Sequence, residues 1–329
     1  MKEIAENILE RISLEKEGQV FIRPEYTAAK INNSDFISIK KIHSNQQLIF
    51  VDGGNAEIFH TPNISLYFNR LYYTLYKNNK RIKGKILEFN SLITTISKSN
   101  DLFFQVELFP AKEGISLPKL RFSISDNTLT SNNRPADISR VGDVVRRLAE
   151  LRLAQTIKEE AIIILDGSLE PKYTYEEEFI DNLSRSKNII CGLSKTSALL
   201  TLSGDSLIGL LYKISPKQSW LYKIAESADS YMFCVKLNEN SKHIFRLDVA
   251  SKDISKVGET VSLLSENSKD PIFPGYPYGL IEADKFARVS NREAERLKTQ
   301  LQLSFGKDYN KIIPYLNAGN AHSILDTIS

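Results

Sequence analysis

Two aspartates end similar apolar runs: LIFVDGG, residues 48–54, and IIILDGS, residues 162–168. An apolar run of this length is typical of a buried strand, so we expect Asp52 and Asp166 at the ends of neighbouring strands. Two ionised carboxylates that lie close together in a partly buried pocket repel each other unless they share a proton or bind a cation. Because oxygen ligands favour hard divalent ions such as Mg²⁺ and Mn²⁺, the pair predicts half of a metal site.

Each of these aspartates is followed by glycine. Glycine lets the backbone turn sharply and leaves space for a substrate beside the ion. The alternative is that each Asp-Gly pair is only a turn that ends a strand. The repetition of apolar strand, aspartate, glycine and small residue favours the metal site.

Two further acids are candidate ligands. Glu150 lies in the middle of RRLAELRLAQ, a helical pattern in which an acid that faces the sheet is unusual unless it binds something. The alternative is a solvated partner of Arg146 or Arg147 at helical spacing, and periodicity leaves both open. Asp284 follows GYPYGLIEA and is expected in the first turn of the last helix. There it can also serve only as a cap or compensate the helix dipole.

A cluster of such acids is suited to phosphodiester hydrolysis with two metal ions, of which one activates water and the other stabilises the leaving oxygen. Lys195, at the end of its strand, is a candidate to neutralise a phosphate oxygen, although a plain surface lysine is an alternative. Tyr276 and Tyr278, in GYPYG, are candidates to stack on bases or to donate to a phosphate. The alternative is that both tyrosines only pack against the domain.

Other chemistries lack their motifs. The four histidines are not paired at ligand spacing, so a zinc site of the HExxH or CxxC type is unsupported, and there is no GxSxG. LSGDSLIGLLYK lacks the GK[ST] that grips phosphates, so any ATP-driven motion must come from a partner. The histidines are His43, His60, His243 and His322, the last of which we assign to the C-terminal tail.

The bulk properties are those of an ordinary globular protein. Of the 329 residues, Lys and Arg exceed Asp and Glu by three, so an anionic partner must be met by local patches. Cys191 and Cys234 have apolar surroundings, which predicts buried thiols without a disulfide. Without a signal-peptide core or a run of eighteen apolar residues, we expect a cytoplasmic protein that does not enter a membrane.

The hydrophobic periodicity predicts the elements that position the candidate residues. An amphipathic helix is expected at the start and ends near Gly18, and three strands are expected over residues 48–76. A strand-rich segment follows over 77–135, and then a long helix over 137–160 leads into the Asp166 strand. Further expected elements are a helix over 181–186, strands in NIICGLSKTSAL, SYMFCVKLN and HIFRLDV, and a last helix from about Leu280 to Leu303.

This order of strands, long helix, carboxylate strand and later helices predicts an α/β protein with a ribonuclease H-like mixed sheet flanked by helices. We expect one domain over residues 1–329, with an N-terminal helix over 1–18 and residues 77–135 as an insertion. In this architecture the acids of the first strand, the long helix, the next strand and the C-terminal helix converge.

Five short pieces together resemble the archaeal NurA nuclease family. They span most of the chain in the family's order. The pieces are VDGG at 51–54, the helix glutamate Glu150, LDGSL at 165–169, GLSKTS at 192–197 and GYPYGLIEAD at 275–284.

The resemblance implies a Mn²⁺-dependent nuclease that acts on single-stranded DNA as an endonuclease and as a 5′ to 3′ exonuclease, in DNA end resection and double-strand break repair. It further implies a homodimer and a hexameric HerA-type helicase-translocase as partner. By motif, Asp52, Glu150 and Asp166 fall on the family's acidic residues and Tyr276 on its tyrosine.

One residue departs from the family pattern. The family usually has histidine after the alanine of the last piece, where this chain has Asp284. A carboxylate can still bind Mn²⁺, but the metal preference and pH dependence are then open. The alternatives are a catalytically weak DNA-binding adaptor of the translocase and an RNA-directed enzyme of the same fold.

Overall fold

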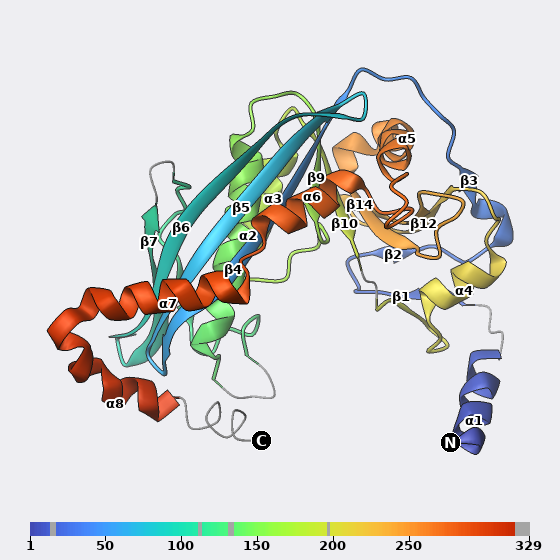
Figure 1. Cartoon of the computed structure of the whole chain (residues 1–329). Coiled ribbons are helices and arrows are strands. Elements are labelled where there is room, and N and C mark those ends of the chain that lie inside the picture. Colours follow the sequence, from blue (N-terminus) through green and yellow to red (C-terminus); the bar gives the residue numbers. More distant parts are fainter. Residues whose placement is uncertain (14–17, 111–113, 131–134, 196–197, 320–329) are drawn as a thin grey trace.

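A long mixed β-sheet runs through the molecule, and helices cover both of its faces (Figure 1). The computed structural model describes residues 1–13, 18–110, 114–130, 135–195 and 198–319. The strand order is β2-β12-β13-β14-β10-β9-β4-β5-β6-β7-β8; β3 also pairs with β12, and β1 and β11 form a separate small sheet. The expected α/β class with a mixed sheet flanked by helices is confirmed.

The strands differ greatly in length, and the longest ones, β4 to β7, lie next to one another in the half of the sheet that ends at β8. They are β1 Val20–Phe21, β2 Thr27–Ala28, β3 Ile37–Ser38, β4 Gln47–Thr61, β5 Ile64–Lys77, β6 Lys80–Lys98, β7 Asp101–Pro110, β8 Arg121–Ser123, β9 Ile162–Asp166, β10 Ile189–Ser194, β11 Leu200–Thr201, β12 Trp220–Glu226, β13 Ser230–Lys236 and β14 Phe245–Ala250.

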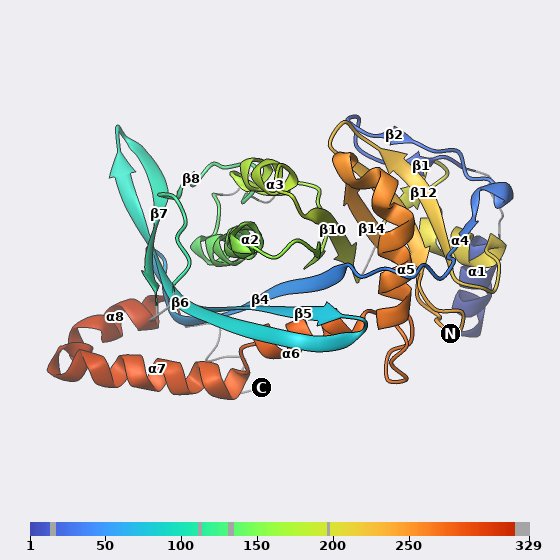
Figure 2. The same ribbon diagram turned by 90° about the horizontal axis from the view of Figure 1, so that it is seen from above.

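The helices lie in two layers. Seen from above, α2 and α3 lie on one face of the long strands, and α6 and α7 lie on the other (Figure 2). The helices are α1 Lys2–Ser13, α2 Ile138–Thr156, α3 Glu176–Ser184, α4 Leu207–Ile214, α5 Val257–Asn267, α6 Tyr278–Ala287, α7 Asn291–Phe305 and α8 Tyr309–Gly319, with short 3-10 turns at Asn33–Asp35, Ser251–Lys256 and Gly306–Asp308.

Parallel pairing at the centre of the sheet places the two Asp-ended runs side by side. β9 pairs in parallel with β4 on one side and with β10 on the other. The last β4 residue that pairs with β9 is Val51, opposite Leu165. The next residue in each run is an aspartate, so the expected neighbourhood of Asp52 and Asp166 follows from the register.

Side-chain alternation gives these two strands two buried faces. Leu48, Phe50, Ile162 and Ile164 belong to the core beneath α5 and α6, whereas their neighbours in sequence belong to the core beneath α2 and α3. This explains why both runs are apolar throughout rather than alternating with polar residues.

The strand count over residues 48–76 differs from the expectation. There are two strands rather than three, because β4 continues through Gly53 and Gly54 to Thr61, paired with β5 along its length apart from a register shift between Glu57 and Phe59. The sheet's third long antiparallel strand is β6, which lies inside the segment expected as an insertion. The turn before β6 is made by Asn78 and Asn79, which have positive φ angles of 49° and 58°. The single-domain description with an insertion stays a prediction.

The expected last helix is two helices. α6 ends at Ala287 and α7 begins at Asn291, because Ser290 caps α7 by accepting a hydrogen bond from the backbone N–H of Glu293. The helix expected over 181–186 also begins earlier, at Glu176. The long helix, the strands around both cysteines and the HIFRLDV strand are confirmed. Thr196, Ser197 and His322 lie outside the described residues.

Candidate active site

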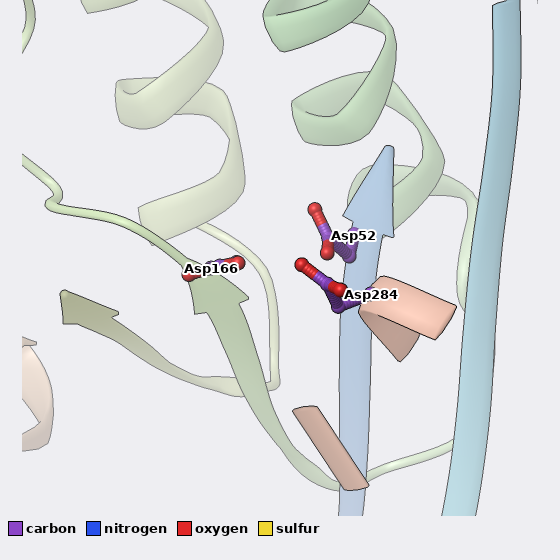
Figure 3. A group of neighbouring side chains, drawn as sticks. All are labelled: Asp52, Asp166 and Asp284. Atoms are coloured by element: carbon purple, nitrogen blue, oxygen red, sulfur yellow. The ribbon is translucent and has the colours of Figure 1, made fainter. Parts of the chain in front are cut away.

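Three carboxylates from distant parts of the chain meet where the parallel pairing of β4 with β9 ends (Figure 3). Asp166 ends its strand as expected, whereas Asp52 lies within β4, which continues to Thr61 because its ladder to β5 goes on. Asp52 comes from β4, Asp166 from the end of β9 and Asp284 from α6, and one oxygen of each lies within 4.8 Å of the others. Carboxylate oxygens at such spacing are suited to a hard divalent ion. Three of the four acids expected to converge therefore meet here. Asp284 lies near the end of α6 and not in its first turn as expected, because the helix already begins at Tyr278.

Strand alternation determines which way these side chains point. Asp52 continues the series Leu48 and Phe50, and Asp166 continues Ile162 and Ile164, so both point to the face covered by α6. α6 crosses that face and carries Asp284 toward Asp52 and Asp166. The departure from the family's histidine therefore leaves a carboxylate inside the cluster.

Close backbone packing holds α6 against β4. A Cβ atom on Gly54 would lie 2.4 Å from the carbonyl oxygen of Ala287, the last residue of α6. A Cβ on Gly53 would lie 2.7 Å from Glu150 Oε1, on the opposite face. The space beside Gly53 and Gly54, which we expected a substrate to occupy, is therefore filled by α2 and α6. Gly167, with φ +106° and nothing within 4 Å of a Cβ, is the glycine that turns and leaves open space.

Substitution of Gly54 by alanine should therefore push α6 away. We expect the variant to lose roughly 1–3 kcal/mol of stability from overpacking and to bind divalent ions more weakly, because Asp284 moves with α6. Thermal unfolding and calorimetric titration measure the two effects. Gly258→Ala in α5, where nothing lies within 4 Å of the added Cβ, is the matched control. Equal metal affinity in Gly54→Ala and wild type would contradict this packing argument.

A buried acid anchors α6 to the neighbouring strand. Glu282 accepts hydrogen bonds from the hydroxyl groups of Tyr72 and Tyr76 on β5, at 2.6 and 2.5 Å, and forms an ion pair with Arg81 at 2.7 Å. It lies two residues before Asp284, so these bonds fix the rotation of α6 about its own axis. Sequence analysis did not single out Glu282.

Lys195 lies between two of the carboxylates. Its Nζ is 2.7 Å from Asp166 Oδ2 and 2.8 Å from Asp284 Oδ1. Burial alone would lower the pKa of Lys195, but the carboxylates of Asp166 and Asp284 outweigh it and raise the pKa above its ordinary value. The ammonium group therefore stays charged and offsets part of the negative charge of the cluster. Its side chain is 39% exposed, so Lys195 lies at the surface and also pairs with the cluster, and its role toward a phosphate stays a prediction.

Asp52 is the acid of the cluster whose protonated form is most favoured by its surroundings. Burial, together with the negative charges of Glu150 and Asp166, raises the pKa of Asp52 to about 8. The backbone N–H of Gly53, which donates to Asp52 Oδ1 at 2.7 Å, and the nearby Lys195 only partly oppose this shift. A bound cation would favour ionisation of Asp52, and this is the electrostatic signature expected of a metal ligand.

Glu150 is buried beside this cluster, but its carboxylate is paired with arginines. Only 2 % of the residue is exposed. Its Oε1 accepts from Arg146 and its Oε2 lies 3.5 Å from Arg147. Both features named for Glu150 in the sequence analysis are thus present: it faces the sheet and it pairs with the two arginines. Arg147 also donates to the carbonyl oxygen of Ser168, which holds the loop after β9.

Tyr276 lies beneath the acids with an unused hydroxyl group. The residue is 1 % exposed, and among the described residues its hydroxyl has no hydrogen-bond partner. Burial raises the pKa of Tyr276, and the nearby charges of Asp166, Asp52 and Asp284 raise it further. The hydroxyl is therefore a neutral donor close to the carboxylates. Tyr278, at the start of α6, is 44 % exposed and packs edge-on against Tyr76.

The carboxylates open onto a cleft of about 400 Å³. Arg146 and Arg288 also line the cleft, and neither was predicted from the sequence to be functional. The available signal was spacing, since Arg146 is one turn before Glu150 and Arg288 is four residues after Asp284. The complete lining is Asp52, Gly53, Gly54, Arg146, Asp166, Asp284 and Arg288.

Comparison with protein families identifies the chain's relatives. The model of one family, described as the NurA domain, matches residues 46–289. The chain belongs to the NurA family. The match covers every element that contributes to the acidic cluster, from β4 to the end of α6.

A solved NurA protein has the same fold. The NurA nuclease from Sulfolobus solfataricus superposes with a TM-score of 0.54 at 15% identity, over 93% of this chain and 95% of that chain. The catalytic domain of human Endonuclease V matches with a TM-score of 0.37 at 10% identity, over 82% of this chain and 93% of that domain. An Argonaute from A. aeolicus matches with a TM-score of 0.35 at 12% identity, over 76% of this chain and 29% of that chain. No curated protein sequence matches.

Membership in the NurA family supports a nuclease, and the solved NurA nuclease shares the mixed α/β fold. The clustered acids fit a divalent metal ion as cofactor. Within the described part of the chain no helix has the length and apolar character needed to span a bilayer.

Proposed function

We propose that this NurA protein is a metal-dependent DNA nuclease that hydrolyses phosphodiester bonds. The observation that carries the proposal is the meeting of Asp52, Asp166 and Asp284 within 4.8 Å, at the bottom of an open cleft that Arg146 and Arg288 also line. The negative charge of the three carboxylates attracts metal ions. The positive side chains of the two arginines at the cleft attract a polyanionic strand.

The proposed cofactor is Mn²⁺, with Mg²⁺ as a second possibility, and the proposed number of ions is two. Asp52, Asp166 and Asp284 would hold them, and Glu150 would join if an ion draws its carboxylate from Arg146. Bound ions of this kind activate water and stabilise the leaving oxygen. The donor set fits, because all four side chains offer carboxylate oxygens.

The chain's own residues perform the remaining tasks. Lys195, released from Asp166 or Asp284 when an ion binds, can neutralise a phosphate oxygen as charge develops on it. Tyr276 can donate its unpaired hydroxyl to water or to a phosphate oxygen near the acids. These roles need no side chain as nucleophile.

The biological setting is proposed from family resemblance. We propose single-strand endonuclease and 5′ to 3′ exonuclease activity in DNA end resection and double-strand break repair, in the cytoplasm. The partners are a second copy of the chain and a hexameric HerA-type helicase-translocase. The sequence lacks the GK[ST] of a P-loop, which is consistent with a separate source of ATP-driven motion.

One assay tests the proposed activity. Single and double strands of DNA, and a single strand of RNA, are labelled at the 5′ or 3′ end and incubated with Mn²⁺, Mg²⁺ or a chelator. We expect cleavage of single-stranded DNA with Mn²⁺ and none with the chelator. Binding without cleavage in any metal would instead identify a catalytically weak adaptor, and faster cleavage of RNA would identify an RNA-directed enzyme.

The departure at position 284 gives a further prediction. Asp284→His should retain or raise Mn²⁺-dependent cleavage, because imidazole also binds Mn²⁺ and restores the family's usual residue. Cleavage rates at several Mn²⁺ and Mg²⁺ concentrations check this, with a shift of preference away from Mg²⁺ expected from the nitrogen ligand. Loss of all cleavage in Asp284→His would contradict the alignment of Asp284 with the family position.

A further inference from the structure

Arg288 lines the cleft, but the function proposed above gives it no specific contact. It is the first residue after α6, and its backbone N–H donates to the carbonyl oxygen of Asp284 at 3.0 Å. This bond ends the helix and places Arg288 one turn beyond a proposed metal ligand.

The backbone of Arg288 is held from two sides. Its Cα lies 3.2 Å from the position of a Cβ on Gly54, so the chain packs directly on β4. Its carbonyl oxygen accepts a hydrogen bond from Arg70 Nη1 at 3.2 Å. Arg70 is itself fixed by two hydrogen bonds to Glu293, at 3.1 and 2.5 Å. Because the backbone of Arg288 is held in this way, the position of its Cα atom at the rim of the cleft is fixed.

The guanidinium of Arg288, by contrast, is exposed and forms no ion pair or hydrogen bond within the described residues. The other two cations at the carboxylates are engaged. Lys195 is paired with Asp166 and Asp284, and Arg146 donates to Glu150 and to the carbonyl oxygen of Gly53 at 3.1 Å. Among these three positive side chains, and within the described residues, Arg288 is thus the one whose N–H donors are all available for a ligand.

A free arginine can make the contact that a phosphate needs. Its five N–H donors form a planar fork that matches two phosphate oxygens, which a lysine cannot do. Asp284, the nearest proposed ligand in sequence, is already paired with Lys195, so the fork is not consumed by that carboxylate. A strand whose scissile phosphate lies at the acids would bring its next phosphate to the rim of the cleft.

We propose that Arg288 binds the backbone phosphate adjacent to the one being cleaved, and so sets the position of a nucleic-acid strand in the cleft. The inference rests on the proposed function insofar as the cleft must receive such a strand. It assigns a substrate-binding role, independent of base sequence, to a residue that need not contact the metal.

The test is strand binding in the presence of a chelator, where no cleavage takes place. Fluorescence anisotropy of a labelled single-stranded DNA is measured with wild type, Arg288→Ala, Arg288→Lys and Arg288→Gln over about 50–200 mM salt. We expect Arg288→Ala and Arg288→Gln to bind about tenfold more weakly at low salt, because a charge-assisted hydrogen bond is lost. The slope of log affinity against log salt should fall by about 0.7, the value for one phosphate contact on a single strand.

Two variants separate the arginine fork from charge and from nonspecific effects. Arg288→Lys should keep the wild-type salt slope but bind more weakly than wild type, because the charge remains and the fork is lost. Arg292→Ala, one turn further on, exposed and outside the cleft lining, is the matched control and should bind like wild type. Far-ultraviolet circular dichroism and thermal unfolding confirm that each variant is folded.

The outcomes distinguish this inference from the proposed nuclease function. Wild-type affinity and slope in both Arg288→Ala and Arg288→Gln would overturn it, even if the wild type cleaves DNA with Mn²⁺. A lower slope in these variants would support it even if no metal yields cleavage, a result that would refute only the nuclease. An unchanged DNA affinity combined with an altered calorimetric Mn²⁺ affinity would also overturn it, because Arg288 would then act on the metal site.

Discussion

Replacing Asp166 with asparagine should reduce metal-dependent cleavage by about a thousandfold or more, and Asp52→Asn should do the same. Each substitution preserves the shape of the side chain but removes a charged oxygen ligand, and metal ions contribute several kcal/mol to the stabilisation of such transition states. Both residues lie at the end of the parallel pairing of β4 with β9, so the fold should stay intact. Initial cleavage rates on labelled single-stranded DNA measure the effect.

The matched control is Asp229→Asn, in the exposed turn between β12 and β13. It removes one acidic group far along the sheet from the cluster and should cleave like wild type. Circular dichroism of each variant excludes unfolding as the cause of any loss. Cleavage by Asp166→Asn at the wild-type rate would refute the assignment of the acidic cluster as the catalytic centre.

Metal binding should depend strongly on pH, because a proton competes with the ion at Asp52. The pKa of Asp52 is raised to about 8 by burial and by the charges of Glu150 and Asp166. Below this pH the ion must displace the proton, so the apparent affinity for Mn²⁺ should rise up to tenfold per pH unit and level off above pH 8. Isothermal titration at pH 6, 7, 8 and 9 measures this. A constant affinity between pH 6 and 8 would contradict it.

The raised pKa of Asp52 also affects the stability of the metal-free protein. Metal affinity should rise with pH, whereas the stability of the metal-free protein should fall. A raised pKa means that the folded state holds its proton more tightly than the unfolded state does. The stabilisation from that proton is complete below pH 4 and is lost as the pH rises to about 8. Relative to Asp52→Asn, whose amide does not titrate, metal-free wild type should therefore lose thermal stability between pH 4 and 8. Parallel melting temperatures for the two proteins over this range would show that Asp52 titrates normally.

Local patterns in the chain were enough to predict the centre of the sheet. The runs before Asp52 and Asp166 are apolar at every position because each strand is buried on both faces, and this is a property of neighbours in sequence. The same holds for α2, whose helical period and capping aspartate, Asp137, are local features. The count of strands over 48–76 was wrong because two adjacent glycines in the sequence indicate a turn, whereas the ladder to β5 keeps them extended.

The sequence by itself therefore determined the two buried strand segments that lead to Asp52 and Asp166, the long helix and the acids that could bind an ion. Only the tertiary structure decided that Asp52 and Asp166 point toward α6, that Asp284 joins them and that Glu150 pairs with arginines. It also decided that Lys195 bridges two acids and that the Arg288 side chain, at the rim, has no partner in the part of the chain that the structure describes. The physical reason is that an apolar run is defined by adjacent residues, whereas these arrangements depend on the close packing of α6 on Gly54 and of α2 on Gly53, contacts between segments far apart in the chain.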